Sequence, residues 1–135
     1  MGNKVVAILN PENGTCKKSV LSLYNLYKQG YEIEKIILVL ENTYHAEKWV
    51  LSFSMPVSKE DIEKLKKRYI KAIVSEWEAL TEEKHPPVEA IVDEVKNVVD
   101  KLPDDYDLLV LGCIEHKSLC KLIEHLDKPI LVVKN

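Results

Sequence analysis

Five short runs rich in valine, isoleucine and leucine constrain the fold of this chain more than any other feature. They occupy residues 5–9, 36–40, 88–92, 107–111 and 129–134. Nearly unbroken apolar runs of this length are typical of strands buried on both faces, as in a parallel sheet. Parallel strands need long crossover connections, and segments with helical spacing separate most of these runs. The sequence therefore predicts a doubly wound α/β fold around a five-stranded parallel sheet.

The first crossover is predicted to be a helix over residues 15–29, because its apolar residues recur at helical spacing. Asn13 or Thr15 is expected to cap its start, and Gly30 suits the left-handed residue beyond its end. The last two crossovers give shorter helices, one capped by Asp93 and one over residues 117–126.

A long excursion separates the second and third predicted strands. From Ser58 onward its apolar residues mark one helical face, and the sequence His85-Pro86-Pro87 is expected to end that helix. The preceding residues, 43–57, are open to two interpretations, a short helix or a lid over a site.

Composition narrows the class of protein. A chain of 135 residues, 46% of them hydrophobic, suits one compact domain spanning residues 1–135. Its net charge of -3 lacks the basic excess that favours nucleic acid or an anionic membrane surface. No stretch approaches the roughly 18 apolar residues of a membrane span, and no basic leader with a cleavage site is apparent. Together with three cysteines best interpreted as free thiols, these features predict a cytoplasmic protein.

Two motifs, in order, carry a family resemblance. DLLVLG ends the fourth predicted strand at Gly112, and KPILVV forms the last strand. With the order of elements over essentially the whole chain, they make the sequence similar to the universal stress protein family. The resemblance implies an adenine nucleotide alpha hydrolase-like, Rossmann-like sandwich with spatial strand order 3-2-1-4-5. It also implies a ligand crevice between the first and fourth strands, where open α/β sheets generally bind ligands.

The loop after the fourth strand departs from the family pattern. In nucleotide-binding members this strand leads into Gly-x-x-Gly and, after nine residues, a further glycine with Ser or Thr, whose backbone NH groups hold phosphates. Here Gly112 matches, but Glu115 stands at the second glycine position, and no glycine lies between Gly112 and Pro129. A carboxylate about 4 Å from one phosphate charge costs about 1 kcal/mol in water and about 4 kcal/mol at an effective dielectric near 20.

The first loop departs as well, because Asn10-Pro11-Glu12 replaces the Asp-Gly-Ser-like turn that the family usually shows. The sequence therefore predicts that ATP is not held in the usual family manner. The alternative is a member that binds adenine nucleotide, or hydrolyses ATP weakly, through a modified loop.

Other motifs support weaker hypotheses. Cys113, His116, Cys120 and His125 have the residue types of a metal site, but their spacing is not a standard zinc pattern, so no metal is expected. Cys113 with His116 also resembles a nucleophile and base, but no residue is evidently placed to orient the histidine, so no catalytic residue is assigned.

Two classes of function follow. The first is a stress-response or regulatory binding module that needs no cofactor and accepts a small molecule in a crevice. The residues expected to line that crevice are Asn10, Glu12, Asn13, Glu41, Gly112, Cys113, Glu115 and His116. The second is an enzyme or a nucleotide or flavin carrier on the same architecture.

The last strand predicts a partner. The topology implied by the resemblance puts it at a sheet edge, where unprotected apolar strands pair readily with other strands. Many family members form a twofold dimer there, so a homodimer through the strand from Ile130 to Lys134 is expected.

Overall fold

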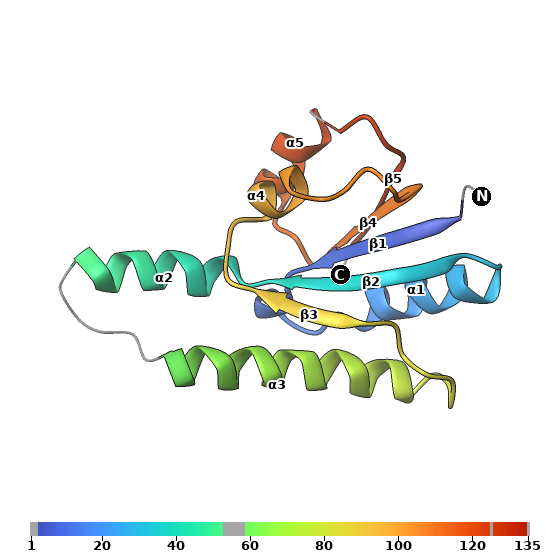
Figure 1. The fold of residues 1–135 in the computed structure, drawn as a ribbon, viewed down its shortest axis with the longest axis horizontal. Helices are drawn as coiled ribbons and strands as arrows, with labels where there is room; N and C mark the ends of the chain where they lie inside the picture. The colour runs from blue at the N-terminus through green and yellow to red at the C-terminus, as the bar shows by residue number, and fades with distance from the viewer. Residues whose placement is uncertain (1–2, 53–58, 125, 135) are drawn as a thin grey trace.

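Five parallel strands form one sheet in the order β3-β2-β1-β4-β5, as predicted (Figure 1). The computed structural model describes residues 3–52, 59–124 and 126–134. The strands are β1 (Lys4–Leu9), β2 (Glu32–Val39), β3 (Val88–Ile91), β4 (Leu108–Gly112) and β5 (Ile130–Val133). The order reverses between β1 and β4, so their carboxyl ends form the topological switch point.

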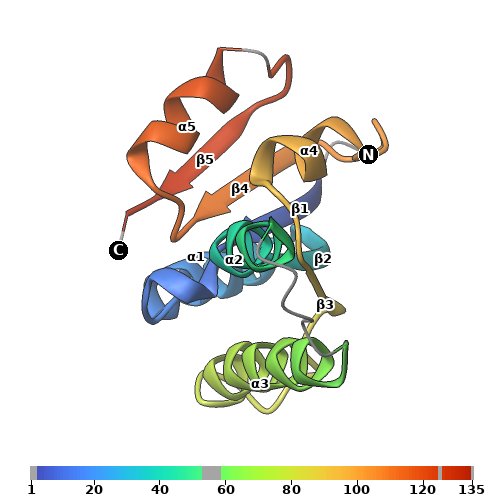
Figure 2. The same cartoon turned by 90° about the vertical axis from the view of Figure 1, so that its left-hand side faces the viewer.

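Helices cover both faces of the sheet. They are α1 (Lys17–Lys28), α2 (Glu41–Ser52), α3 (Lys59–Glu78), α4 (Val95–Asp100) and α5 (His116–Ile123), with a short 3-10 helix, η1 (Pro11–Asn13), after β1. Figure 2 shows α1 and α3 on one side of the sheet and α4 and α5 on the other, while α2 extends from the carboxyl end of β2.

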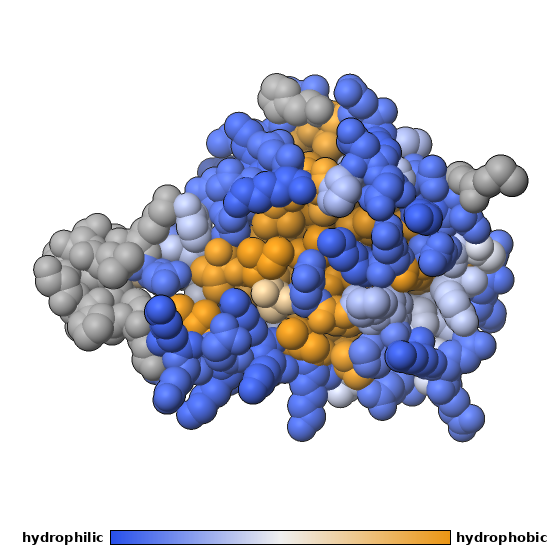
Figure 3. All heavy atoms as spheres, viewed as in Figure 1, coloured by the Kyte–Doolittle hydropathy of each residue, from blue (hydrophilic) through white to orange (hydrophobic). Residues whose placement is uncertain are grey.

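Two apolar clusters, one on each face, hold these layers together. The first joins the sheet to α1 and α3, and the second joins it to α4 and α5. Both clusters draw residues from β1, whose residues 5–9 are all buried. This burial on both faces explains why the run has no polar alternation. Figure 3 shows apolar side chains gathered over the sheet between α4 above and α3 below.

The aromatic side chain of Trp77 fixes α3 against α1. It is 1% exposed, and its ring meets those of Tyr24 and Tyr27 edge to face, with centroids 5.6 and 5.7 Å apart. Its indole Nε1 donates a hydrogen bond to the Glu83 carbonyl at 3.1 Å. The chain after α3 therefore folds back onto Trp77.

That contact explains one wrong prediction. The α3 helix ends at Glu78, before the expected stop at His85-Pro86-Pro87. The backbone NH groups of Leu80 and Thr81 both bond to the Trp77 carbonyl, closing a turn that takes the chain off the helical path. Ser58, the expected helix start, lies outside the described residues.

Two predicted helix caps are also wrong. Helix α1 begins after Cys16, with no side-chain cap, because the Asn13 amide is used by another loop and Thr15 lies one position too early. Helix α4 begins after Glu94, and Asp93 instead accepts from the Glu94 NH at 2.7 Å. Gly30 does take the left-handed conformation predicted for it, with φ 102°.

Residues 43–57 were predicted to form either a short helix or a lid, and the described part of this segment is helical, since α2 spans Glu41–Ser52. The remaining residues of that segment, 53–57, lie outside the described part of the chain. Within the described ranges, no helix combines the length and apolar character needed to cross a membrane.

Candidate functional site

The loops after β1 and β4 are joined at the topological switch point. Leu9 pairs with Gly112 at the end of the two strands, and the Asn10 NH donates to the Gly112 carbonyl at 3.3 Å. The Asn13 amide donates to the Cys113 carbonyl at 2.8 Å. The structure thus brings Asn10, Asn13, Gly112 and Cys113 together.

Asn10 shapes the first loop from a buried position. Its side chain is 2% exposed, and its Oδ1 accepts from the Glu12 NH at 3.0 Å. This local bond stands in for a backbone turn, and Pro11 starts η1 with a fixed φ. Asn10 is therefore engaged in building the loop.

Gly112 is required by packing. An added β-carbon would lie 2.8 Å from Leu9 Cδ2 and 2.8 Å from Ser19 Cβ, and it would also collide with Ser19 Oγ. Contacts this short are essentially never seen for real β-carbons, so a side chain would push α1 away from the sheet. The close approach of Ser19 accounts for this glycine whether or not any phosphate binds beside it.

Cys113 occupies an unusual backbone conformation. Its φ of 59° lies in the left-handed region, which costs a non-glycine residue free energy. Its side chain is 3% exposed, and its Sγ lies 3.7 Å from Ser19 Oγ and 3.8 Å from the Thr15 carbonyl. The turn after β4 therefore directs the thiol inward, against the start of α1.

Glu12 caps helix α2 from the loop after β1. Its Oε1 accepts from the Asn42 NH at 2.8 Å, and its Oε2 accepts from the Thr43 NH at 2.9 Å and the Thr43 hydroxyl at 2.7 Å. A helix start has unsatisfied NH groups and a positive end, and it favours an anion there. In this protein the anion at the start of α2 is the carboxylate of Glu12.

Glu41 plays a similar part at α4. Its Oε2 accepts a hydrogen bond at 3.2 Å from the backbone NH of Val95, which is the first residue of that helix. On α4, the Asn97 side-chain amide donates to Asp93 Oδ1 at 3.0 Å. This hydrogen bond is the largest of the interactions that lower the pKa of Asp93 below its ordinary value. Glu41 is thus bound to the start of α4.

Glu115 immediately precedes α5 and is exposed, and no bond from its side chain caps the helix. His116 is the first residue of α5, but its side chain and all of His125 lie outside the described residues. Among the residues that the structure describes, no group of three or more His, Cys, Asp or Glu side chains is arranged to hold a metal ion.

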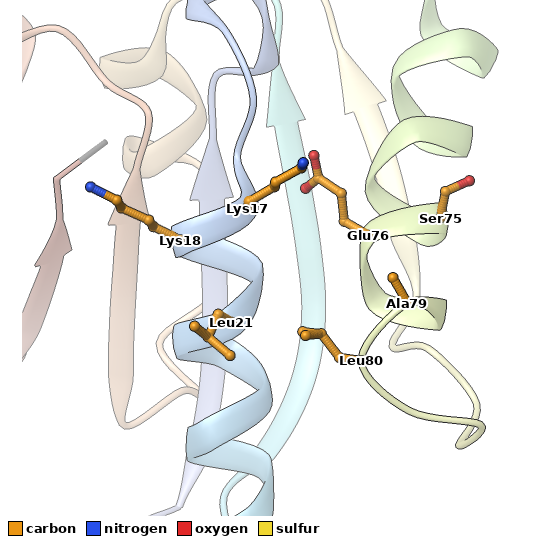
Figure 4. Close-up of a pocket in the computed structure, with 7 residues that line it drawn as sticks. All are labelled: Lys17, Lys18, Leu21, Ser75, Glu76, Ala79 and Leu80. Carbon is orange, nitrogen blue, oxygen red and sulfur yellow. The ribbon is translucent and has the colours of Figure 1, made fainter.

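Two cavities lie between helices and neighbouring elements of the fold. One, of about 490 Å³, lies between α5 and β5, and Cys113, Cys120, Ile123 and Val133 are among its lining residues. The other, of about 470 Å³, lies between α1 and α3, where Leu21 and Leu80 face each other below Lys17 and Glu76 (Figure 4). Burial raises the pKa of Glu76, and the facing Lys17 opposes that rise.

Sequence reasoning missed Ser19 and Thr43 as residues that shape this site. Both lie on helices and neither belongs to a recognisable motif. The partners of Ser19 and Thr43 are 94 and 31 residues away in the chain, so no local spacing could reveal them.

Three glutamates lie at the helix starts that follow β2, β3 and β4. Glu12 and Glu41 occupy the starts of α2 and α4, and Glu115 stands exposed before α5. A phosphate bound at one of these helix starts would lie near a negative charge.

Comparison with known proteins identifies the family to which the chain is related. No protein-family model matches the chain. The chain is 31% identical over 137 residues to a universal stress protein of Aquifex aeolicus (strain VF5), covering 97% of this chain and 99% of the relative. The strand order observed here agrees with the fold that this relationship implies. The chain belongs to the universal stress protein family.

Proposed function

We propose that this universal stress protein is a cytoplasmic, homodimeric binding module of the stress-response class that does not hold ATP in the usual family manner. The observation that carries the proposal is the seating of Glu12 on α2, where three hydrogen bonds of 2.7–2.9 Å use the helix start. A phosphate at that position would have to displace a carboxylate already bound there.

The turn after β4 supports the same conclusion. Phosphate loops use successive backbone NH groups that point outward, and glycines allow the close approach. In this chain Asn13 binds the Cys113 carbonyl, Cys113 turns its side chain inward, and Glu115 adds a negative charge before α5. A ligand of this crevice is accordingly a small molecule without a polyphosphate group, and no cofactor is needed.

Titration calorimetry tests the nucleotide part of the proposal. We expect no saturable heat from the wild type with Mg·ATP up to millimolar concentration. A double variant, Glu12→Gln with Glu115→Gln, keeps side-chain size and removes both charges, so we expect any ATP binding to be stronger there. Micromolar binding by the wild type would support the alternative, a modified nucleotide loop, and would overturn the proposal.

The partner proposal concerns the edge strand β5. Among the described residues, β4 alone pairs with it, and within β5 Leu131 has 38% of its surface exposed. On the neighbouring helix α5, Ile123 is 48% exposed. A second copy paired along the strand from Ile130 to Lys134 would satisfy the free backbone groups and cover apolar surface.

Light scattering tests this dimer. We expect a mass twice that of the 15.5 kDa chain at micromolar concentration. Leu131→Lys should shift the protein toward monomer, whereas Leu21→Lys, at a leucine 45% exposed on α1, should not. A wild type that is monomeric, or that responds equally to both substitutions, would contradict an interface at β5.

A further inference from the structure

Two buried cysteines from distant parts of the chain meet between the sheet and the start of α1. Cys16 is 1% exposed at the start of α1, and Cys113 is 3% exposed after β4. Both belong to the apolar cluster between the sheet and α1. The structure contains them as thiols.

The contacts of the Cys113 sulfur locate it beside Cys16. It lies 3.8 Å from the carbonyl oxygen of Thr15, which directly precedes Cys16. It also lies 3.7 Å from the hydroxyl of Ser19, one turn further along α1 and on the same helix face as Cys16. A hydrogen bond with the Cys113 thiol is the leading cause that raises the pKa of Cys16.

The two thiols differ in access. Cys113 lines the cavity of about 490 Å³ between α5 and β5, which also borders the exposed Cys120. Cys16 is not among the residues that line this cavity. A small oxidant entering from solvent would therefore reach Cys113 first.

We propose that Cys16 and Cys113 form a redox-active pair that is oxidised to an intramolecular disulfide by low-molecular-weight disulfides. The Cys113 thiolate attacks one sulfur of the small disulfide, a mixed disulfide forms, and the first small thiol leaves with a proton. Cys16 then attacks the Cys113 sulfur, the bond to the small molecule breaks, and a second small thiol leaves with the proton of Cys16. Two protein thiols are oxidised while one small disulfide is reduced to two thiols.

The linkage would fix the loop after β4 to the start of α1. That loop carries the left-handed Cys113 and adjoins Gly112, so oxidation would lock the switch point of the sheet. The pair encloses most of the chain between positions 16 and 113, so the disulfide should stabilise the fold markedly.

Glutathione disulfide is the probe for the test, applied to folded, fully reduced protein in a Cys120→Ser background. That substitution removes the exposed thiol and leaves the buried pair intact. We expect the intact mass to fall by two hydrogen atoms with no retained glutathione, the peptides containing Cys16 and Cys113 to be joined, and the melting temperature to rise by several degrees. Because disulfides tolerate only a narrow range of β-carbon separations, linkage in the folded protein is a direct test of the geometry.

A matched variant checks the order of steps. Adding Cys16→Ser removes the second thiol, so Cys113 should retain one glutathione and no intramolecular link should form. Failure of Cys16 and Cys113 to link in the folded Cys120→Ser protein would overturn the proposal. So would a preferred bond between Cys113 and Cys120 in the wild type.

Discussion

Replacing Gly112 with alanine tests whether packing explains the one glycine that this chain shares with the family loop. The added β-carbon would lie 2.8 Å from both Leu9 Cδ2 and Ser19 Cβ, and closer still to Ser19 Oγ. Neither Leu9 nor Ser19 can move easily, because both are fully buried at the junction of β1, β4 and α1.

The expected cost follows from that crowding. Inserting one methyl group into a well-packed core costs about 1–3 kcal/mol, and the three short contacts favour the upper half of this range. For a domain of 135 residues, a loss of about 2 kcal/mol lowers the melting temperature by roughly 6–10 °C. Thermal and urea unfolding monitored by circular dichroism would measure both quantities.

Ser19 provides the matched control. Ser19→Ala removes the oxygen nearest to the added carbon, so Gly112→Ala should cost less in the Ser19→Ala background than in the wild type. If Gly112→Ala left stability unchanged, or if its cost did not depend on Ser19, the packing explanation of this glycine would be refuted.

Glu12, Glu76 and Trp77 each offer a further test of the interactions described above. In Glu12→Gln an amide replaces the carboxylate and can accept only part of the hydrogen bonds that Glu12 accepts from Thr43, so the free energy of unfolding in urea titrations should fall by about 1–2 kcal/mol. An unchanged urea midpoint would show that the cap contributes nothing. Burial raises the pKa of Glu76, so the folded state binds its proton more tightly than the unfolded state, and wild-type stability should fall as the pH rises from 4.5, the ordinary pKa, through the raised pKa. Glu76→Gln should remove this fall in melting experiments at different pH values. An unchanged pH dependence in that variant would contradict the prediction. Trp77→Phe should cost about 1–3 kcal/mol in chemical unfolding, since it loses ring area and the bond to the Glu83 carbonyl, and a neutral effect would refute the role assigned to this contact.

The strands were predictable because their signal is local. Each apolar run reports burial on both faces, and all five predicted strands are present, although β2 begins at Glu32, four residues earlier than expected. Residues 32–35 mix charged and apolar side chains, so the apolar run is shorter than the strand. Pairing with β1 extends the strand back to Glu32. The strand order came from the family resemblance, since periodicity alone does not fix it.

The helix ends and the site contacts were not predictable in the same way. Asn13 looked like a cap for α1, but its amide bonds to Cys113, 100 residues away. Glu41 accepts a hydrogen bond from the first NH of α4, 54 residues away in the chain, and no local pattern predicts that bond. Such choices depend on which segments meet in space, and single-sequence spacing carries no information about them.

The two carboxylates at the edge of the sheet have a consequence for dynamics. Glu12 ties the loop after β1 to α2, and Glu41, the first residue of α2, ties that helix to α4. These links run in series, so loosening one removes support from the next. Amide hydrogen exchange should therefore report the early residues of α2 and α4 opening together, as one cooperative unit that spans both faces of the molecule.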